Sequence, residues 1–265
     1  MEETKFIHRV SKGSKFSQIY IPRENKNEFE PGDIVEVRLL KKDFKIYYSK
    51  NLVKLTEFKE KLIKEIFKFL MSQKKIRQIF IFGSFLTKKI EYNDIDVLIL
   101  TEEKNNFEKN VYNNLINKFN IKFHLISFDE ERLKELLEIC PLTRSIFYYY
   151  VSNKEFKIPK ETKINKKHLK FLLMMPEDLL KINLDYGIEY YNVLRKLYTI
   201  ESFLIGKEIP PDKIDVYIEK TIGKTKFDLL KRNDVLDKSI LKEVKDIIKD
   251  KLGKIYRRMN YGKKE

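Results

Sequence analysis

Three short apolar runs in the middle of the chain constrain its fold more than any other feature of the sequence. Each run has the length of a strand: IRQIFIF (76–82), DIDVLIL (94–100) and IKFHLISF (121–128). Apolar residues at helical spacing surround these runs, at 55–71, 107–119 and 129–139. Strands that alternate with helices predict an α/β domain, which we place over residues 53–158.

The segment before this domain has a strand-and-turn pattern without helices. Strands are expected at FIHRV (6–10), FSQIYIP (16–22), IVEVRLL (34–40) and FKIYYS (44–49). Turns are expected at SKGSK (11–15) and at PGD (31–33), where Gly32 is free to take a positive φ. Because four short strands bury little apolar surface, residues 1–52 are expected to need a partner.

The segment after the α/β domain has helical patterns only. Long helices are expected at 164–175, 176–205 and 239–259, with connecting segments at 206–213 and 223–234. Its apolar and aromatic residues recur at the spacing of a bundle face: Tyr190, Tyr191, Leu194, Leu197 and Phe203. We therefore expect an α+β protein with an all-β domain over 1–52, an α/β domain over 53–158, a linker near 155–163 and a helical bundle over 159–265.

The charge of the chain points to a polyanionic partner. It has 55 Lys and Arg against 40 Asp and Glu, a formal net charge of +15 and a pI of about 9.5. Such an excess favours nucleic acid or nucleotide phosphate, although a lysine-rich solvated surface accounts for it equally well. One cysteine, Cys140, excludes an internal disulfide framework and fits a reducing compartment. No run has the length of a signal-peptide core or a membrane span, so we expect a cytoplasmic protein with no membrane partner.

Two aspartates open the second apolar run. Residues two apart in a strand project from the same side, so Asp94 and Asp96 are expected to point together. Two carboxylates that close are costly unless a cation neutralises them, and Mg²⁺ with nucleotide phosphates is the expected solution. Upstream, Gly83 lets the backbone approach closely and Ser84 offers a hydroxyl and an N–H at an expected helix start, a favourable place for phosphate. Lys88, in the loop that follows, is a candidate phosphate contact or a solvated lysine.

The order of these parts resembles the nucleotidyltransferase superfamily of the DNA polymerase β type. The resemblant parts are the apolar strand that ends in Gly83-Ser84, the spacing of about ten residues, and the Asp-x-Asp of the next strand, within residues 60–140. Among the members, the minimal nucleotidyltransferases are the most similar. The resemblance implies that Gly83 and Ser84 bind nucleotide phosphates and that Asp94 and Asp96 bind Mg²⁺. It also implies transfer of a nucleoside monophosphate from an NTP, with ATP as the expected donor, to an acceptor.

One part of the family pattern is missing. Members normally supply a third carboxylate from the next strand, where this chain has Lys122 and His124 at the same-facing positions. His124 is a candidate metal ligand or base, and a histidine packed in the sheet is the alternative. Asp129 and Glu130 lie just beyond the strand and are expected to begin the next helix.

Residues 9–50 resemble the AbrB/SpoVT swapped-hairpin domain. The resemblant parts are VSKGS and IYIPRE, PGDIVEV, and the closing FKIYYS. The resemblance implies an intertwined homodimer and DNA binding through basic residues near the first strand, and the candidates are Arg9, Lys12, Lys15 and Arg23. A dimerisation module that does not touch DNA is the alternative. The expected architecture is thus a swapped-hairpin domain, a polymerase-β-like nucleotidyltransferase domain and a C-terminal helical bundle.

The helical end vaguely resembles the bundles that accompany minimal nucleotidyltransferases, including the HEPN type. The Arg-then-His spacing of HEPN ribonucleases is absent, because KLYTIESF follows Arg195. The basic segment at 254–264 is a candidate nucleic-acid contact or a solvated tail.

Two functions remain open. The first is a nucleotidyltransferase linked to a DNA-binding domain, with a protein, an RNA or a small molecule as acceptor. The second is a non-catalytic, antitoxin-like DNA-binding regulator with a degenerate nucleotidyltransferase fold. A drug-modifying enzyme of the aminoglycoside type is a third possibility, and it requires a pocket in the helical domain.

Overall fold

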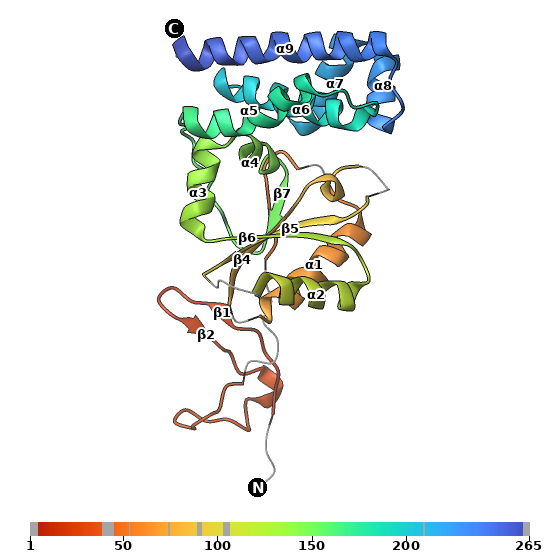
Figure 1. Cartoon of the computed structure of the whole chain (residues 1–265). Coiled ribbons are helices and arrows are strands. Elements are labelled where there is room, and N and C mark those ends of the chain that lie inside the picture. The colour runs from red at the N-terminus through yellow and green to blue at the C-terminus, as the bar shows by residue number, and fades with distance from the viewer. Residues whose placement is uncertain are drawn as a thin grey trace. The chain divides into compact units, whose positions relative to one another are not determined.

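The chain divides into two compact units, Met1–Asp43 and Phe44–Glu265. The computed structural model describes residues 5–38, 45–52, 54–73, 75–88, 92–102, 107–208 and 210–261 (Figure 1). The sequence placed the first boundary at residue 52. The difference arises because strand β3 (Tyr47–Tyr48) pairs with β7 (Tyr150–Ser152) in the sheet of the second unit.

The first unit contains one short antiparallel hairpin. Its strands are β1 (Ser11–Lys12) and β2 (Ser17–Gln18), and a 3-10 turn, η1 (Arg23–Asn25), follows them. The predicted SKGSK turn is confirmed, with the Gly13 amide donating to the Phe16 carbonyl at 2.9 Å. The predicted turn at Gly32 is also confirmed, since this glycine has a φ of 112°.

The other strands expected in the first unit do not form. Residues 6–10 and 34–38 pair with no strand of the part of the chain that the structure describes, and 39–40 lie outside it. Apolar side chains of this unit are correspondingly exposed, with Ile34 fully so. A strand is stable only when its backbone groups find partners, and one copy of these residues offers too few.

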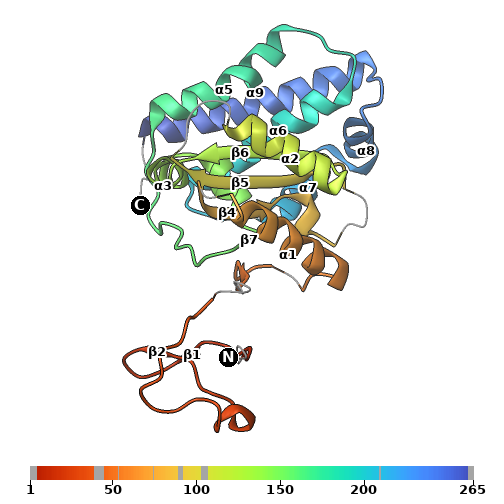
Figure 2. The same cartoon turned by 90° about the horizontal axis from the view of Figure 1, so that it is seen from below.

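The second unit is built on a five-stranded mixed sheet with the order β3-β7-β4-β5-β6. Figure 2 shows β6, β5, β4 and β7 in that succession. The central strands are β4 (Ile76–Phe82), β5 (Ile95–Thr101) and β6 (Phe123–Phe128), which confirm the three predicted strands. β4 pairs antiparallel with β5 and β7, and β5 pairs parallel with β6.

Helices pack against both faces of this sheet. Helices α1 (Glu57–Met71) and α2 (Phe107–Phe119) cover one face, as Figure 1 shows. They bury alternate residues of the central strands in one core: Ile79, Ile81, Ile95, Val97, Ile99, Phe123 and Leu125. The side chains between them, such as Phe80 and Leu98, pack on the other face with α3 (Glu130–Ile139). Period-two alternation in β5 therefore reflects a sheet buried on two sides.

The C-terminal half is a helical bundle. Its helices are α5 (Lys166–Lys181), α6 (Gly187–Leu204), α7 (Pro211–Ile222), α8 (Lys224–Arg232) and α9 (Lys238–Tyr261). They share one apolar core that includes the predicted bundle-face residues Tyr190, Tyr191, Leu194 and Leu197. Together with the two sheets, the bundle confirms the predicted α+β class with a helical C-terminus. Among the described residues, no helix combines the length and apolarity needed to cross a membrane.

Three details of the bundle differ from the sequence prediction. Helix α5 does not end before Pro176 but continues through it to Lys181, because Pro176 is buried together with Leu173 and Leu179 and this packing outweighs the lost hydrogen bond. Helix α8 lies inside the predicted connecting segment at 223–234, where Phe227 and Leu230 are its only buried residues. The long helix predicted over 176–205 is interrupted, since α5 ends at Lys181 and α6 begins at Gly187. The basic segment continues α9, as far as Tyr261.

The bundle is joined to the sheet by polar contacts from α4 (Pro141–Ile146) and the residues after it. Arg144 forms an ion pair with Glu208 at 2.8 Å. The Tyr149 hydroxyl donates to Asp212 Oδ1, at the start of α7, at 3.0 Å. The sheet and the bundle therefore share fixed contacts next to Tyr150, the register partner of Phe82 at the end of β4.

Candidate functional site

The ends of β4 and β5 bring Gly83 against Asp96. Phe82 and Asp96 are register partners, so the residue after Phe82 lies beside the carboxylate. A Cβ atom at Gly83 would stand 1.9 Å from Asp96 Oδ2, and Gly83 has a φ of 80°. Only glycine tolerates both the backbone conformation and the contact. The two halves of the predicted site are thus in direct contact.

The turn after Gly83 corrects one sequence expectation. We expected a helix to begin here, but only a single 3-10 turn forms, η2 (Ser84–Leu86). It is closed by hydrogen bonds from the Thr87 amide and hydroxyl to the Ser84 carbonyl, at 3.0 and 2.7 Å. Within the described residues the Ser84 hydroxyl has no hydrogen-bond partner. Any phosphate contact here would therefore come from turn amides and this hydroxyl, without a long helix dipole.

The next strand places His124 beside Asp96. The two residues are register partners of the parallel pair β5–β6, and His124 Nδ1 lies 3.0 Å from Asp96 Oδ1. The His124 side chain is 59% exposed and that of Asp96 is 20% exposed. His124 thus occupies the strand position at which the family pattern has a third acidic residue. The imidazole is open to solvent on its other side.

Burial raises the pKa of Asp96 above its usual value. The hydrogen bond from His124 opposes this shift, and the charge of Asp94 adds to it. The ionised form of Asp96 is therefore less favourable in the free protein than that of an exposed carboxyl group. A bound cation would relieve that cost, because it favours the ionised form.

The donor set suits part of a magnesium site. Asp94 and Asp96 offer hard oxygen ligands, which Mg²⁺ prefers. Among the described residues, no three His, Cys, Asp or Glu side chains lie close enough to hold a metal by themselves. Mg²⁺ usually keeps several waters and binds phosphate oxygens together with one or two carboxylates, so the residues present fit an ion shared with a nucleotide.

Lys88 and Lys122, two lysines that the sequence singled out, are exposed and form no ion pair with Asp94 or Asp96 among the described residues. Lys88 is exposed in the loop after η2, and its neighbour Lys89 lies outside the described residues. Lys122 is exposed, and its carbonyl accepts from the Ile95 amide at 3.0 Å. No ion pair in the described part of the chain joins Lys122 to Asp94. Asp129 caps α3 by accepting from the Arg132 amide at 2.7 Å, as predicted.

A hollow beside His124 was missed by the sequence reasoning. It has a volume of about 400 Å³ and lies between α2 and the β6 edge. Its lining residues are Glu108, Lys109, Tyr112, Phe123, His124 and Leu125. The signal was weak, because Glu108, Lys109 and Tyr112 read as the ordinary polar side of a helix. His124 thus belongs both to the carboxylate site and to this hollow.

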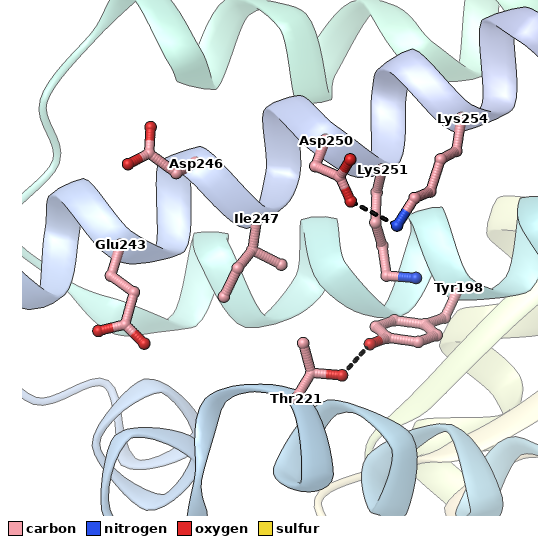
Figure 3. A pocket seen from close by; sticks show the side chains of 8 residues that line it. All are labelled: Tyr198, Thr221, Glu243, Asp246, Ile247, Asp250, Lys251 and Lys254. Atoms are coloured by element: carbon pink, nitrogen blue, oxygen red, sulfur yellow. Dashed lines mark hydrogen bonds and ion pairs between the residues drawn. The ribbon is translucent and has the colours of Figure 1, made fainter.

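A second hollow, of about 450 Å³, lies in the helical bundle (Figure 3). Its lining residues are Tyr198, Thr221, Glu243, Asp246, Ile247, Asp250, Lys251 and Lys254. Most of its charges are already paired: Glu243 with Lys226, Asp250 with Lys254, and Lys251 with Glu201. A pocket in the helical domain therefore exists, but four of its five charged side chains are already held in ion pairs.

The four basic residues proposed for DNA contact are all exposed in the first unit. Lys12 is in β1, Lys15 is in the turn after it and Arg23 begins η1, whereas Arg9 precedes the hairpin. Arg195, at the position examined for a HEPN motif, is instead bound to Asp215 at 3.0 Å within the bundle. Its role is structural.

Comparison with known proteins supports the nucleotidyltransferase superfamily for the α/β domain. Residues 64–149 match the family model described as "Polymerase beta, Nucleotidyltransferase". No curated protein sequence matches the chain. Among solved structures, the chain is similar to spectinomycin adenyltransferase from Enterococcus faecialis, crystallised with ATP and spectinomycin. That match has 14% identity and a TM-score of 0.42, and covers 75% of this chain and 100% of the other. The family match does not include the first unit.

Proposed function

We propose that the chain is a Mg²⁺-dependent nucleotidyltransferase, which moves the nucleoside monophosphate of an NTP to an acceptor hydroxyl. ATP is the expected donor. The observation that carries the proposal is the contact between Gly83 and Asp96, where the missing Cβ makes room for the carboxylate. It joins the phosphate-binding turn to the metal-binding pair within the domain that matches the nucleotidyltransferase family.

Each residue has a distinct task. Asp94 and Asp96 hold Mg²⁺, which neutralises negative charge on the phosphates when it is bound. The turn amides and the hydroxyl of Ser84 orient the triphosphate, with Lys88 as a further contact. His124 donates from Nδ1 to Asp96. Its other ring nitrogen, Nε2, is then left to accept the proton of the acceptor hydroxyl.

The reaction balances with these groups. The acceptor oxygen forms a bond to the α-phosphorus, and the bond from the α-phosphorus to the bridging oxygen breaks. Pyrophosphate leaves with the electron pair of that bond, and the acceptor proton passes to His124 Nε2. Positioning and charge neutralisation lower the barrier, with no covalent enzyme intermediate.

A labelling experiment tests the activity and sorts the acceptor class. The protein is incubated with α-³²P-labelled NTP, Mg²⁺ and a cell lysate, and protein, RNA and small-molecule fractions are separated. The proposal predicts covalent label in one fraction, and its loss in the Asp94→Asn, Asp96→Asn double variant. Label that appears equally with both proteins contradicts it.

The first unit is proposed to form a homodimer and to bind DNA. Support comes from its exposed apolar side chains, among them Ile7, Phe16, Ile34 and Val37, which one copy leaves in water. Arg9, Lys12, Lys15 and Arg23 are exposed and free to approach phosphates. DNA affinity should fall steeply with salt and should fall further in the Arg9→Ala, Arg23→Ala variant. A salt-independent response contradicts phosphate contact.

A non-catalytic regulator is the second candidate. The observation that favours it is the absence of a third acid: His124 takes that position, and no three-ligand cluster is found among the described residues. In this case the domain binds nucleotide without transferring it. Nucleotide binding without label transfer in any fraction would support this candidate over the enzyme.

A further inference from the structure

Lys59, in the first turn of α1, is buried to a degree that is unusual for a lysine. Its residue surface is 5% exposed, although lysine is rarely buried. A cation at a helix N-terminus also opposes the helix dipole. Burial lowers the pKa of Lys59 from its usual value, because a charged ammonium is less favourable away from water. A residue that is unfavourable locally is a candidate for a role elsewhere.

The ammonium group of Lys59 contacts the turn that follows Gly83. Its Nζ donates to the Thr87 carbonyl at 2.8 Å. It also lies 5.4 Å from the centre of the Phe85 ring and 5.8 Å from that of Tyr92. These two rings pack edge to face at 4.9 Å. One cation thus contacts the backbone and the rings on both sides of the loop.

These contacts lead to both halves of the candidate site. Thr87 donates twice to the Ser84 carbonyl, from its amide and its hydroxyl, so the Lys59–Thr87 bond continues to the phosphate turn. Tyr92 precedes Asp94 by two residues, just before β5, the strand that carries Asp96. Lys59 therefore contacts both the turn that carries Ser84 and the residue that leads into β5.

We propose that Lys59 is a positioning residue, which holds the Ser84 turn and the approach to Asp94 in a fixed relation so that both can contact one Mg²⁺-nucleotide. The inference rests on the proposed function. It assigns no substrate contact to Lys59. The lysine acts through Thr87 and the Phe85–Tyr92 pair.

The test uses the full chain with Lys59→Met, which keeps the length and the apolar stem but removes the ammonium. Lys59→Arg keeps a donor and a charge, and Lys64→Met, at an exposed lysine of the same helix, is the matched control. Three quantities are measured: thermal stability, amide hydrogen exchange of peptides spanning 83–94 without nucleotide, and affinity for α,β-methylene-ATP with Mg²⁺. Lys59→Gln replaces Lys59→Met if the latter does not fold.

The positioning role predicts a specific pattern. Lys59→Met should change the thermal stability of the whole domain little, while the 83–94 peptides exchange faster. Its nucleotide affinity should fall by about tenfold, as expected for loss of a hydrogen bond from a charged donor. Lys59→Arg should recover part of both effects, and Lys64→Met should behave as wild type.

Other outcomes overturn the inference in distinguishable ways. If hydrogen exchange and nucleotide affinity are unchanged in Lys59→Met while wild type binds nucleotide, the positioning role of Lys59 is excluded and the proposed function stands. A large fall in melting temperature with faster exchange throughout the domain shows a merely structural role. Wild type that binds no nucleotide overturns the proposed function, and the site role of Lys59 with it.

Discussion

At the scale of single residues, the contact between Gly83 and Asp96 limits most strongly which residue types the candidate site can accept. The backbone of Gly83, with φ 80° and ψ −159°, lies in a region open almost to glycine alone. A methyl group there would also displace the Asp96 carboxylate. Residue identity at this position is therefore fixed twice, by conformation and by space.

Gly83→Ala should lose most nucleotide binding and be less stable by about 1–3 kcal/mol, the usual cost of forcing such a backbone conformation. Gly253→Ala is the control, since a Cβ there meets nothing within 4 Å, and in the helix it should stabilise by about 0.5–1 kcal/mol. Urea unfolding and calorimetry measure the two effects. Gly83→Ala with wild-type stability and affinity would show that the contact is not real.

His124 offers a second test at this scale. His124→Asp puts a carboxylate beside Asp96, so without metal the protein should be less stable through like-charge repulsion. Added Mg²⁺ should restore the stability, and Mg²⁺ affinity should rise by about tenfold, or ~1.4 kcal/mol. Melting curves with and without Mg²⁺ report both. If Mg²⁺ gives the same shift as in wild type, His124 does not face the metal position.

Part of the candidate site could be predicted from the strand pattern together with the family resemblance, because a strand fixes which side chains share a face. Asp96 and His124 meet as register partners on neighbouring strands, and the resemblance points to the His124 strand as the one that supplies a third ligand. Lys59 could not be predicted. It lies 24 or more residues upstream on a helix whose pattern is ordinary, and only tertiary packing brings it to Thr87.

At the scale of elements, the contact between Tyr149 and α7 links the sheet to the bundle. Burial raises the pKa of Tyr149 to about 12, and the hydrogen bond to Asp212 adds to the shift. A tyrosine whose pKa is higher in the folded than in the unfolded state stabilises the fold below its unfolded pKa. That stability is lost as the pH rises from 10.0 to about 12.

Tyr149→Phe should therefore cost about 1 kcal/mol near neutral pH, where the hydrogen bond is intact. The difference from wild type should shrink as the pH approaches 12, because wild type loses the contribution there. Urea midpoints across this range give the result. Tyr148→Phe is the control, since the described contacts include no hydrogen bond of its hydroxyl. A difference independent of pH would contradict a folded-state hydrogen bond.

Element predictions succeeded where periodicity is strong and failed where tertiary contacts decide. The strands β4, β5 and β6 and the helices α1, α2 and α3 lie within one to two residues of their predicted positions. Helix α8 has a polar composition with Gly223 before it, so its sequence resembles a loop, and burial of Phe227 and Leu230 stabilises it as a helix. Pro176 misled for the same reason, since bundle packing outweighs its local preference.

At the scale of the whole molecule, the apolar surface of the first unit is the main unexplained feature of a single copy. Its described residues bury no large apolar side chain, and Ile7, Phe16, Ile34 and Val37 are more than half exposed. Residues 6–10 and 34–38, where strands were predicted, also pair with no strand in the described part of the chain. A second copy would supply both apolar contacts and strand hydrogen bonds.

The chain should therefore sediment at about twice its mass of 32.1 kDa. Ile34→Asp with Val37→Asp should shift it toward the monomer, because each places a charge in the proposed interface. Phe171→Asp, at an exposed apolar position of α5, is the control and should remain dimeric. Sedimentation equilibrium distinguishes the cases. A wild-type monomer at all concentrations would contradict the dimer.

The central claim is that Asp94 and Asp96 bind a divalent ion, which also binds a nucleoside triphosphate held at Gly83 and Ser84. Calorimetric titration of α,β-methylene-ATP, with and without Mg²⁺, tests it most directly. We expect one site per chain, saturable only with Mg²⁺, and loss of that site in the folded Asp94→Asn, Asp96→Asn variant. Binding of equal strength in wild type and variant, or no binding in wild type, would contradict it.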